Sequence, residues 1–272
     1  MMDTKSKQLQ QQYEGYLQTP LLWNKQTVFG LHQLQIPKQN TIIFNRKTAK
    51  NLRLGKLVEQ FVSTELNAIK EISILLENVQ VHNGKQTIGE LDCILEYDKT
   101  PIHLEIVYKF YLYDASAMDS EIAHWIGPNR NDTLLKKYRK LKEKQLPLLH
   151  NPHTKAILEG LNLKAEKIIQ RVLFKAQLFI PYKNNPIKFE QLNEACLYGF
   201  YVNASEINQF ADCKFYIPSK RDWLIAAHPQ VHWQTYNQFS EEIKELTSQR
   251  MSPLCWIKHP NGTLEKFFVV WW

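Results

Sequence analysis

The chain has 272 residues, a formal net charge of +7 and a pI of about 9.0, and 44% of its residues are hydrophobic and 22% charged. This composition is typical of a folded protein and excludes a chain that is disordered throughout. The length allows one large domain or a core with a smaller appendage, and the positive charge favours an anionic partner.

The cysteines and the first residues of the chain indicate in which cellular compartment the protein is expected. The four cysteines are scattered without a CxxC pair, which argues against a zinc knuckle or a disulfide framework and indicates a reducing environment. Residues 1–13 are polar and lack the apolar stretch of a signal peptide. No run approaches the ~18 apolar residues that span a bilayer. We therefore expect a cytoplasmic protein without a membrane partner, of open oligomeric state.

Two segments in the N-terminal part of the sequence have features of helices. Residues 1–17 are polar and compatible with a helical arm, and a more apolar segment runs from Leu21 to Pro37. Residues 51–69 carry apolar side chains every three or four positions. This spacing predicts an amphipathic helix, for which Asn51 is the expected cap.

A three-stranded meander is expected next. The segments 72–81, 87–97 and 102–113 are rich in branched and aromatic residues, as strands are. Asn83-Gly84 is a strong hairpin signal between the first two, and the turn at residues 98–101 joins the second to the third. The sequence therefore predicts consecutive antiparallel strands.

A second helix and a fourth strand complete the predicted core. Residues 132–146 have helical periodicity, and Pro147 is expected to end the helix. Residues 161–169 form either a short helix or a connection. Residues 171–180 alternate apolar and polar side chains, which predicts a strand. The remaining chain is mixed and aromatic, up to the terminal segment 267–272, and is expected to pack on the core.

Two acidic residues and a lysine fall on the second and third predicted strands. Because side chains alternate between the faces of a strand, Asp92 points away from its apolar neighbours, and Glu105 and Lys109 share one face. Two carboxylates and an ammonium group on a rigid sheet are able to bind a divalent cation and orient an attacking water. Phosphodiester hydrolysis is therefore the first hypothesis.

The second predicted helix is strongly basic. By the helical period its lysines gather near one face, and its apolar residues lie on the other. A basic edge of this kind suits contacts with the phosphates of DNA or RNA. The lysines expected to bind nucleic acid are Lys136, Lys137, Lys140 and Lys144.

The order helix, meander, helix, strand over residues 50–182 resembles the PD-(D/E)XK nuclease superfamily. Gly89-Glu90-Leu91-Asp92 looks like the strand with the first metal ligand, Glu105 with Lys109 like the acid–lysine strand, and Glu59 like the glutamate of the leading helix. The resemblance implies Mg²⁺ or Mn²⁺ held by Asp92, Glu105 and the Ile106 carbonyl, with Glu59 binding directly or through water. Asp92, Glu105 and Lys109 would then be catalytic.

The whole chain is also similar to a bacterial family named only as domain of unknown function 1853, in phrases such as His-Leu-Glu and Lys-Gln-Leu-Pro-Leu. The two resemblances imply an α/β fold with a restriction-endonuclease-like core, whose mixed central sheet is flanked by helices, and a C-terminal α+β extension. The expected segments are an arm and lead-in (1–49), the core (50–182) and the extension (183–272).

One departure from the superfamily pattern leaves alternatives open. The lysine usually follows the acid by two residues, but Val107 stands there and Lys109 lies four residues on, about 13 Å away along a regular strand. Lys109 is then either catalytic, reaching back by its long stem or a bulge, or an ion-pair partner of an acid. Alternatively, Glu59 and the basic face of the helix are solvated surface without a role in a site. His103 and His124 alternatively have structural roles. The rival functions are a catalytically inactive module that binds nucleic acid or protein, and an interaction scaffold.

Overall fold

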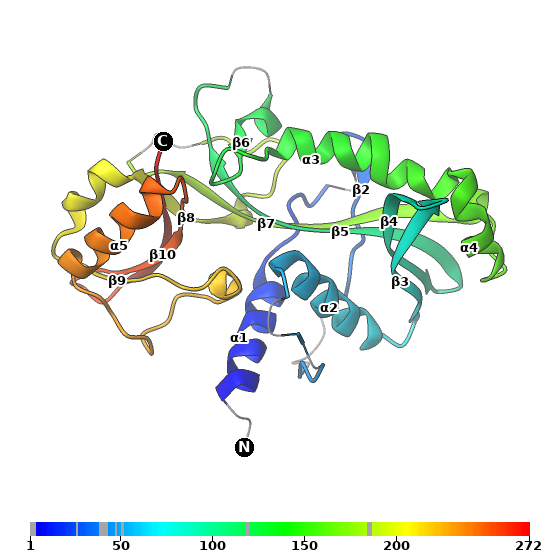
Figure 1. Ribbon diagram of the computed structural model, residues 1–272, viewed down its shortest axis with the longest axis horizontal. Coiled ribbons are helices and arrows are strands. Elements are labelled where there is room, and N and C mark those ends of the chain that lie inside the picture. The colour runs from blue at the N-terminus through cyan, green and yellow to red at the C-terminus, as the bar shows by residue number, and fades with distance from the viewer. Residues whose placement is uncertain are drawn as a thin grey trace. The chain divides into compact units, whose positions relative to one another are not determined.

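The computed structural model describes residues 4–272 except 26, 38–42, 47, 50–51, 118–119 and 184–186. It is a mixed α/β fold, in which a central sheet of parallel and antiparallel strands is flanked by helices (Figure 1). Its contacts divide the chain into two compact units that are interleaved in sequence. Unit 1 comprises Met1–Pro20, Lys109–Leu135 and Ala176–Trp272, and unit 2 comprises Leu21–Tyr108 and Lys136–Lys175. The division into segments 1–49, 50–182 and 183–272 was inferred from the order of the predicted helices and strands. This division remains a prediction.

Unit 2 contains the predicted meander. The strands β3 (Ile72–Asn83), β4 (Gln86–Tyr97) and the first part of β5 (Thr100–Tyr113) pair antiparallel in sequence order. Gly84 has a φ of 58° in the first turn, and Asp98 and Lys99 have φ values of 48° and 63° in the second. These left-handed conformations are those that tight hairpins require. The three predicted strands and both turns are confirmed.

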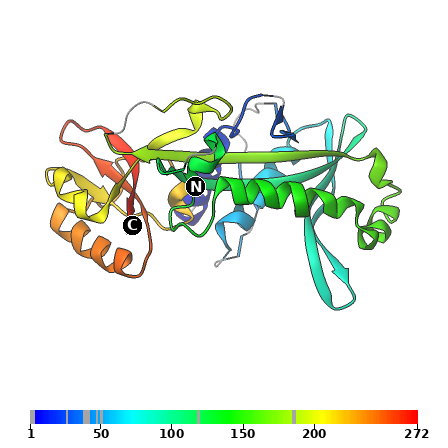
Figure 2. The same cartoon turned by 90° about the horizontal axis from the view of Figure 1, so that it is seen from above.

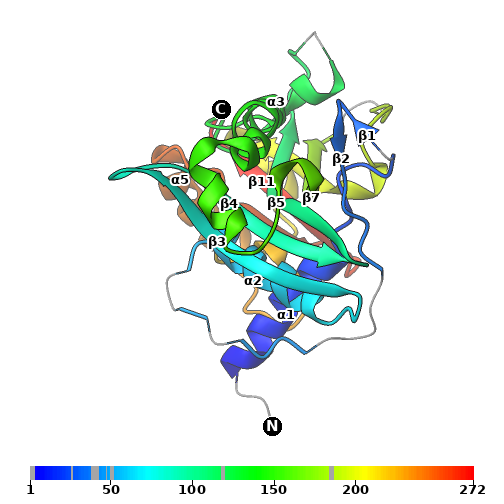
Figure 3. The same cartoon turned by 90° about the vertical axis from the view of Figure 1, so that its right-hand side faces the viewer.

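The predicted first core helix is α2 (Leu54–Asn67). Its buried residues recur at helical spacing and pack toward β3, so burial of one apolar face stabilises it. Asn51, the expected cap, lies outside the described residues. Figure 3 shows α2 along one face of β3 and β4.

Strand β4 separates from β5 partway along its length. The β4–β5 pairing covers only Cys93↔Leu104 to Tyr97↔Thr100, whereas the β3–β4 pairing continues to Asn83↔Gln86. The outer parts of β3 and β4 therefore form a two-stranded arm, visible as the projecting hairpin in Figure 2. Asp92 lies at the fork where the arm leaves β5.

The second predicted helix continues past its expected end. After α3 (Leu134–Lys140), the chain forms a π-helical turn over Leu141–Gln145 and then a 3-10 helix over Leu146–His150. The α- and π-helical part ends at Gln145, close to the end expected before Pro147, but the chain continues past Pro147 as a 3-10 helix. The Leu146 amide reaches back to the Leu141 carbonyl, and this wider turn lets Pro147 enter the first turn of the 3-10 segment, where no proline N–H is needed.

A connection of short helical turns links this helical run to β7 (Ile169–Pro181), the predicted fourth strand. The link contains the short helix α4 (Lys155–Glu159) and a 3-10 turn at Ala165–Lys167. The segment 161–169 is therefore mainly a connection. Within unit 2 the strand order is β3-β4-β5-β7. Unit 2 also contains a separate two-stranded sheet of β1 (Thr27–Val28) and β2 (Leu31–His32).

Unit 1 contains the C-terminal strands. The order from β7 is β8 (Leu197–Asn203), β11 (Leu264–Val270), β10 (Leu254–Lys258) and β9 (Lys214–Tyr216). β8 runs parallel to β7 and β11, and β10 is antiparallel to both its neighbours. A Cβ atom on Gly199 would lie 1.9 Å from the Lys266 carbonyl oxygen, so the β8–β11 pair requires glycine there.

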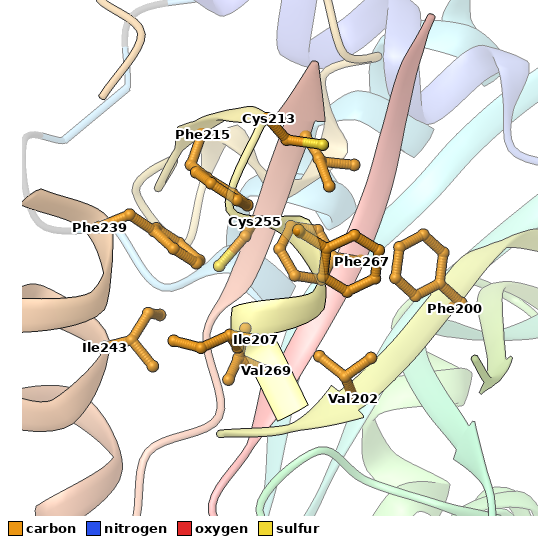
Figure 4. Packing of buried hydrophobic residues seen from close by; sticks show 12 residues of the cluster. Phe200, Val202, Ile207, Cys213, Phe215, Phe239, Ile243, Cys255, Phe267 and Val269 are labelled. Atoms are coloured by element: carbon orange, nitrogen blue, oxygen red, sulfur yellow. The ribbon is translucent and has the colours of Figure 1, made fainter. Parts of the chain in front are cut away.

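Helices and aromatic side chains complete unit 1. The predicted N-terminal helix is α1 (Thr4–Gln18), and its Tyr13 and Tyr16 are buried. Helix α5 (Tyr236–Ser248) covers the aromatic cluster shown in Figure 4. The short strand β6 (Trp125–Ile126) pairs with the end of β5. None of the described helices is long and apolar enough to cross a bilayer. The cluster comprises Phe200, Val202, Ile207, Phe210, Cys213, Phe215, Phe239, Ile243, Cys255, Ile257, Phe267 and Val269.

Candidate metal centre

Three carboxylates of unit 2 converge at the fork between β4 and β5. Glu59 comes from α2, and Glu90 and Asp92 come from one face of β4, two residues apart. One oxygen of each lies within 4.8 Å of the others, and all three residues are partly buried. Oxygen atoms at this spacing are suitable ligands for a hard divalent cation.

The fork itself fixes the Asp92 carboxylate. Because β4 leaves β5 after the Cys93↔Leu104 pair, the Ile106 amide does not continue the ladder with β4. It donates instead to Asp92 Oδ2 at 2.9 Å. A backbone donor that would otherwise lose its partner thus holds Asp92 in place.

Lys56 places a positive charge within this carboxylate group. Its Nζ donates to Glu59 Oε2 at 2.8 Å, to Asn78 Oδ1 at 2.9 Å and to Glu90 Oε1. Two of the three converging carboxylates therefore already have a cationic partner. The ammonium is partly exposed, so a competing cation has access to the same oxygens.

Glu105 lies beside Asp92 but in a different environment. Its side chain is fully buried, Oε1 accepts from His103 Nε2 at 3.1 Å, and Oε2 accepts from Gln145 Nε2. His103 Nδ1 lies 3.1 Å from the Gln170 amide nitrogen, which can only donate. The proton of His103 therefore sits on Nε2 and points at Glu105. Burial lowers the pKa of His103 to about 4, so this donor is neutral at pH 7.

Gln145 connects Glu105 to an amine on α3. While its nitrogen donates to Glu105, its Oε1 accepts from Lys137 Nζ at 2.8 Å. The π-helical turn between Lys137 and Gln145 adds a residue to that turn, which brings both side chains to the acidic side of the helical run. Lys137 is partly buried there, whereas Lys136, Lys140 and Lys144 are exposed.

The three acids at or near the fork share one electrostatic property. Burial raises the pKa of Glu59, of Asp92 and of Glu105 to about 7. The charge of Glu105 raises the pKa of Asp92 further, and the charge of Lys137 opposes the rise in both. The site therefore holds protons at neutral pH that a bound cation would displace.

The predicted lysine of the acid–lysine strand has another partner. Lys109 lies in unit 1, and its Nζ is 2.5 Å from Asp132 Oδ2 of the same unit. Of the predicted metal ligands, Glu59 and Asp92 come together with Glu90, and Glu105 adjoins Asp92. Glu90 was missed, although strand alternation places it on the Asp92 face. His124 lies in unit 1, where it stacks on Tyr113.

The raised carboxylate pKa values predict a pH-dependent stability difference between the wild type and Asp92→Asn. A folded-state pKa above the unfolded value means that the native protein binds more protons, so ionisation of Asp92 destabilises it as the pH rises. In metal-free buffer, Asp92→Asn should gain about 1 kcal/mol relative to the wild type between about pH 6.5 and about pH 8. Urea unfolding measures this difference. Loss of the Asp92 charge also lowers the pKa of Glu59, which that charge raises in the wild type, so the measured difference reports on the coupled acids. Groups that do not interact with Asp92 titrate equally in both proteins, and a constant difference would contradict the assignment.

The fold and this cluster define a mixed α/β protein with a carboxylate centre at a strand fork. Residues 6–270 match the family "Domain of unknown function (DUF1853)", and the chain belongs to this family. No curated protein and no solved structure matches the chain significantly.

Proposed function

We propose that this protein is a metal-dependent nuclease that hydrolyses phosphodiester bonds in DNA or RNA. The observation that carries the proposal is the convergence of Glu59, Glu90 and Asp92 within 4.8 Å at the β4–β5 fork. The order α2, β3–β5, α3, β7 supports a restriction-endonuclease-like core of the PD-(D/E)XK type. The exposed lysines of the helical run supply positive charge for phosphate contacts.

The donor set fits Mg²⁺ or Mn²⁺. Carboxylate oxygens are the ligands these ions prefer, and the partial exposure of the trio leaves room for water ligands. Such an ion, when bound, polarises a phosphate and lowers the pKa of a coordinated water. Glu59, Glu90 and Asp92 would hold it, and Glu105, fixed by His103 and Gln145, would set the charge of Asp92.

Lys137 is the amine best placed to act on substrate in this proposal. Its charge lowers the pKa of both Asp92 and Glu105, and Gln145 orients it toward them. An ammonium beside the acids stabilises the negative charge that develops on a phosphate during hydrolysis. Lys109, paired with Asp132, is assigned a structural role here.

The direct test is metal titration followed by cleavage assays. We expect Mn²⁺ to bind the purified protein and to support cleavage of at least one of four substrates: single- and double-stranded DNA and RNA. Chelation should abolish cleavage, and added salt should weaken substrate binding because phosphate contacts release counterions. Failure to bind any divalent cation would refute the proposal.

A catalytically inactive nuclease-fold module that binds nucleic acid or protein is the second candidate. The observation that favours it is Lys56, whose ammonium bonds Glu59 and Glu90 in place of a metal. If this ion pair is permanent, the acids have a structural role only. The two functions then differ in what happens when the Lys56 charge is removed.

At a pH above the carboxylate pKa values of about 7, Lys56→Gln should bind Mn²⁺ about tenfold more tightly than the wild type, a gain of about 1.4 kcal/mol, because a competing charge has gone. Near neutral pH the gain should be smaller, because the Lys56 charge lowers the pKa of Glu59 and Asp92, and its loss leaves protons that compete with the ion. Isothermal titration calorimetry measures the affinity. Lys136→Gln, which removes an exposed charge from α3, serves as the matched control and should change little. Binding by Lys56→Gln alone, with none by the wild type, would favour the inactive module.

A further inference from the structure

A second group of reactive side chains lies in unit 1, at the ends of three neighbouring strands. β9 and β10 pair with Lys214 opposite Lys258, so the next residues, Cys213 and His259, also face each other. Glu265 follows in β11 after the turn that closes when the His259 amide bonds the Thr263 carbonyl. Strand register thus brings a thiol, an imidazole and a carboxylate together.

The hydrogen bonds order these three groups. Glu265 Oε2 lies 2.7 Å from His259 Nε2, and Cys213 Sγ lies 3.7 Å from His259 Nδ1. A carboxylate only accepts hydrogen bonds, so the imidazole proton is on Nε2 and Nδ1 accepts from the thiol. A nucleophile, a base and a carboxylate that orients the base are the three parts of an activated nucleophile.

Cys213 forms part of the wall of a surface cavity. The cavity, of about 430 Å³, is lined by Cys213, its neighbours Asp212 and Lys214, and the first turn of α5. The start of α5 and Lys214 bring positive charge or partial charge to this wall, and the Asp212 carboxylate brings negative charge. Cys255, by contrast, lies within the packed cluster, while Cys213 is at its end (Figure 4).

The charge state of Cys213 shows why a base is needed. Burial, with a contribution from the adjacent Asp212 carboxylate, raises the pKa of Cys213. The resting group is therefore a thiol at neutral pH, and the thiol is a weak nucleophile. His259 is placed to remove its proton at the moment of attack.

We propose that Cys213, His259 and Glu265 form a second chemical site, at which Cys213 accepts a small acyl group from an activated ester or thioester. The sulfur bonds to the acyl carbon while the thiol proton passes to His259 Nδ1. The bond from the acyl carbon to the leaving oxygen or sulfur then breaks, and that proton goes to the leaving group. No oxidant or reductant takes part, and Glu265 keeps the imidazole in the required tautomer.

The test uses the full chain and 4-nitrophenyl acetate as acyl donor. We expect release of nitrophenol and one acetyl group per chain, which peptide mass mapping should place on Cys213. His259→Gln should slow acetylation about 100-fold, as removal of a general base does. His232→Gln changes an exposed histidine of the same unit and should leave the rate unchanged.

Two results would overturn this assignment. One is acetylation at other residues with Cys213 unmodified, which mapping of the wild type detects without any variant. The other is an equal rate in His259→Gln, provided that its circular dichroism matches the wild type. Glu265→Gln should slow the reaction less than His259→Gln and shift its pH profile, which a purely structural role would not do.

Discussion

Asp92→Asn should abolish Mn²⁺ binding and reduce cleavage at least about 1,000-fold, the scale expected when a central charge-stabilising group is lost. Asp92 is the one carboxylate that belongs both to the converging trio and to the pair with Glu105. Asparagine keeps the size and still accepts from the Ile106 amide, so the fork should remain intact. The loss would then come from the missing charge.

A matched variant separates this charge from charge elsewhere on the protein. Asp132→Asn removes one carboxylate from the Lys109 ion pair in unit 1 and should leave metal binding unchanged. Calorimetry with Mn²⁺ and cleavage assays on both variants measure the contrast. Full metal affinity in a folded Asp92→Asn protein would show that the trio is not a metal site.

The strands and turns around this site were predictable because they depend on local signals. Gly84 permits the left-handed turn that joins β3 to β4, and branched residues fill both strands. Strand alternation alone placed Asp92 on the polar face, and the same rule applied to Glu90 would have completed the trio. Local pattern was enough for these residues.

The fork between β4 and β5 and the partner of Lys109 were not predictable from local sequence pattern. Where β4 leaves β5 depends on how far the two strands pair, and nothing in their alternation marks Cys93 as the last paired residue. Lys109 shares a face with Glu105 in an ideal strand, yet the Lys109 amine forms an ion pair with Asp132, which comes from a later loop. The side chain of Lys109 is therefore placed by a residue distant in sequence, Asp132, and not by its spacing from Glu105.

The alignment of Gln145 with Lys137 depends on the π-helical turn, which a regular helical period does not include. In a regular helix, residues eight positions apart are offset by about 80° around the axis. Because the turn at Leu141–Gln145 is wider, Gln145 instead bridges Lys137 to Glu105. Irregular backbone of this kind is frequent at functional sites.

Lys137→Met should reduce cleavage about 100-fold while leaving Mn²⁺ binding at high pH intact, because methionine keeps the bulk and removes the charge. Lys137 lowers the pKa of Asp92 and Glu105, so without it both acids hold their protons to higher pH. Metal binding should therefore shift toward higher pH, since the ion competes with those protons. Cleavage should remain slow even after binding is restored, if the amine acts on the substrate.

Two controls decide between the candidate lysines. Lys140→Met removes a neighbouring charge from the exposed face of α3, and Lys109→Met breaks the ion pair with Asp132. Both should stay within a few-fold of the wild-type rate at saturating Mn²⁺ and high pH, because the amine that Gln145 accepts from is that of Lys137. The Lys140 charge also lowers the pKa of Glu105, so Lys140→Met should share only the shift of metal binding toward higher pH. A large loss in Lys109→Met with little change in Lys137→Met would return the catalytic role to the lysine of the strand. It would also require the Lys109–Asp132 pair to break when substrate binds.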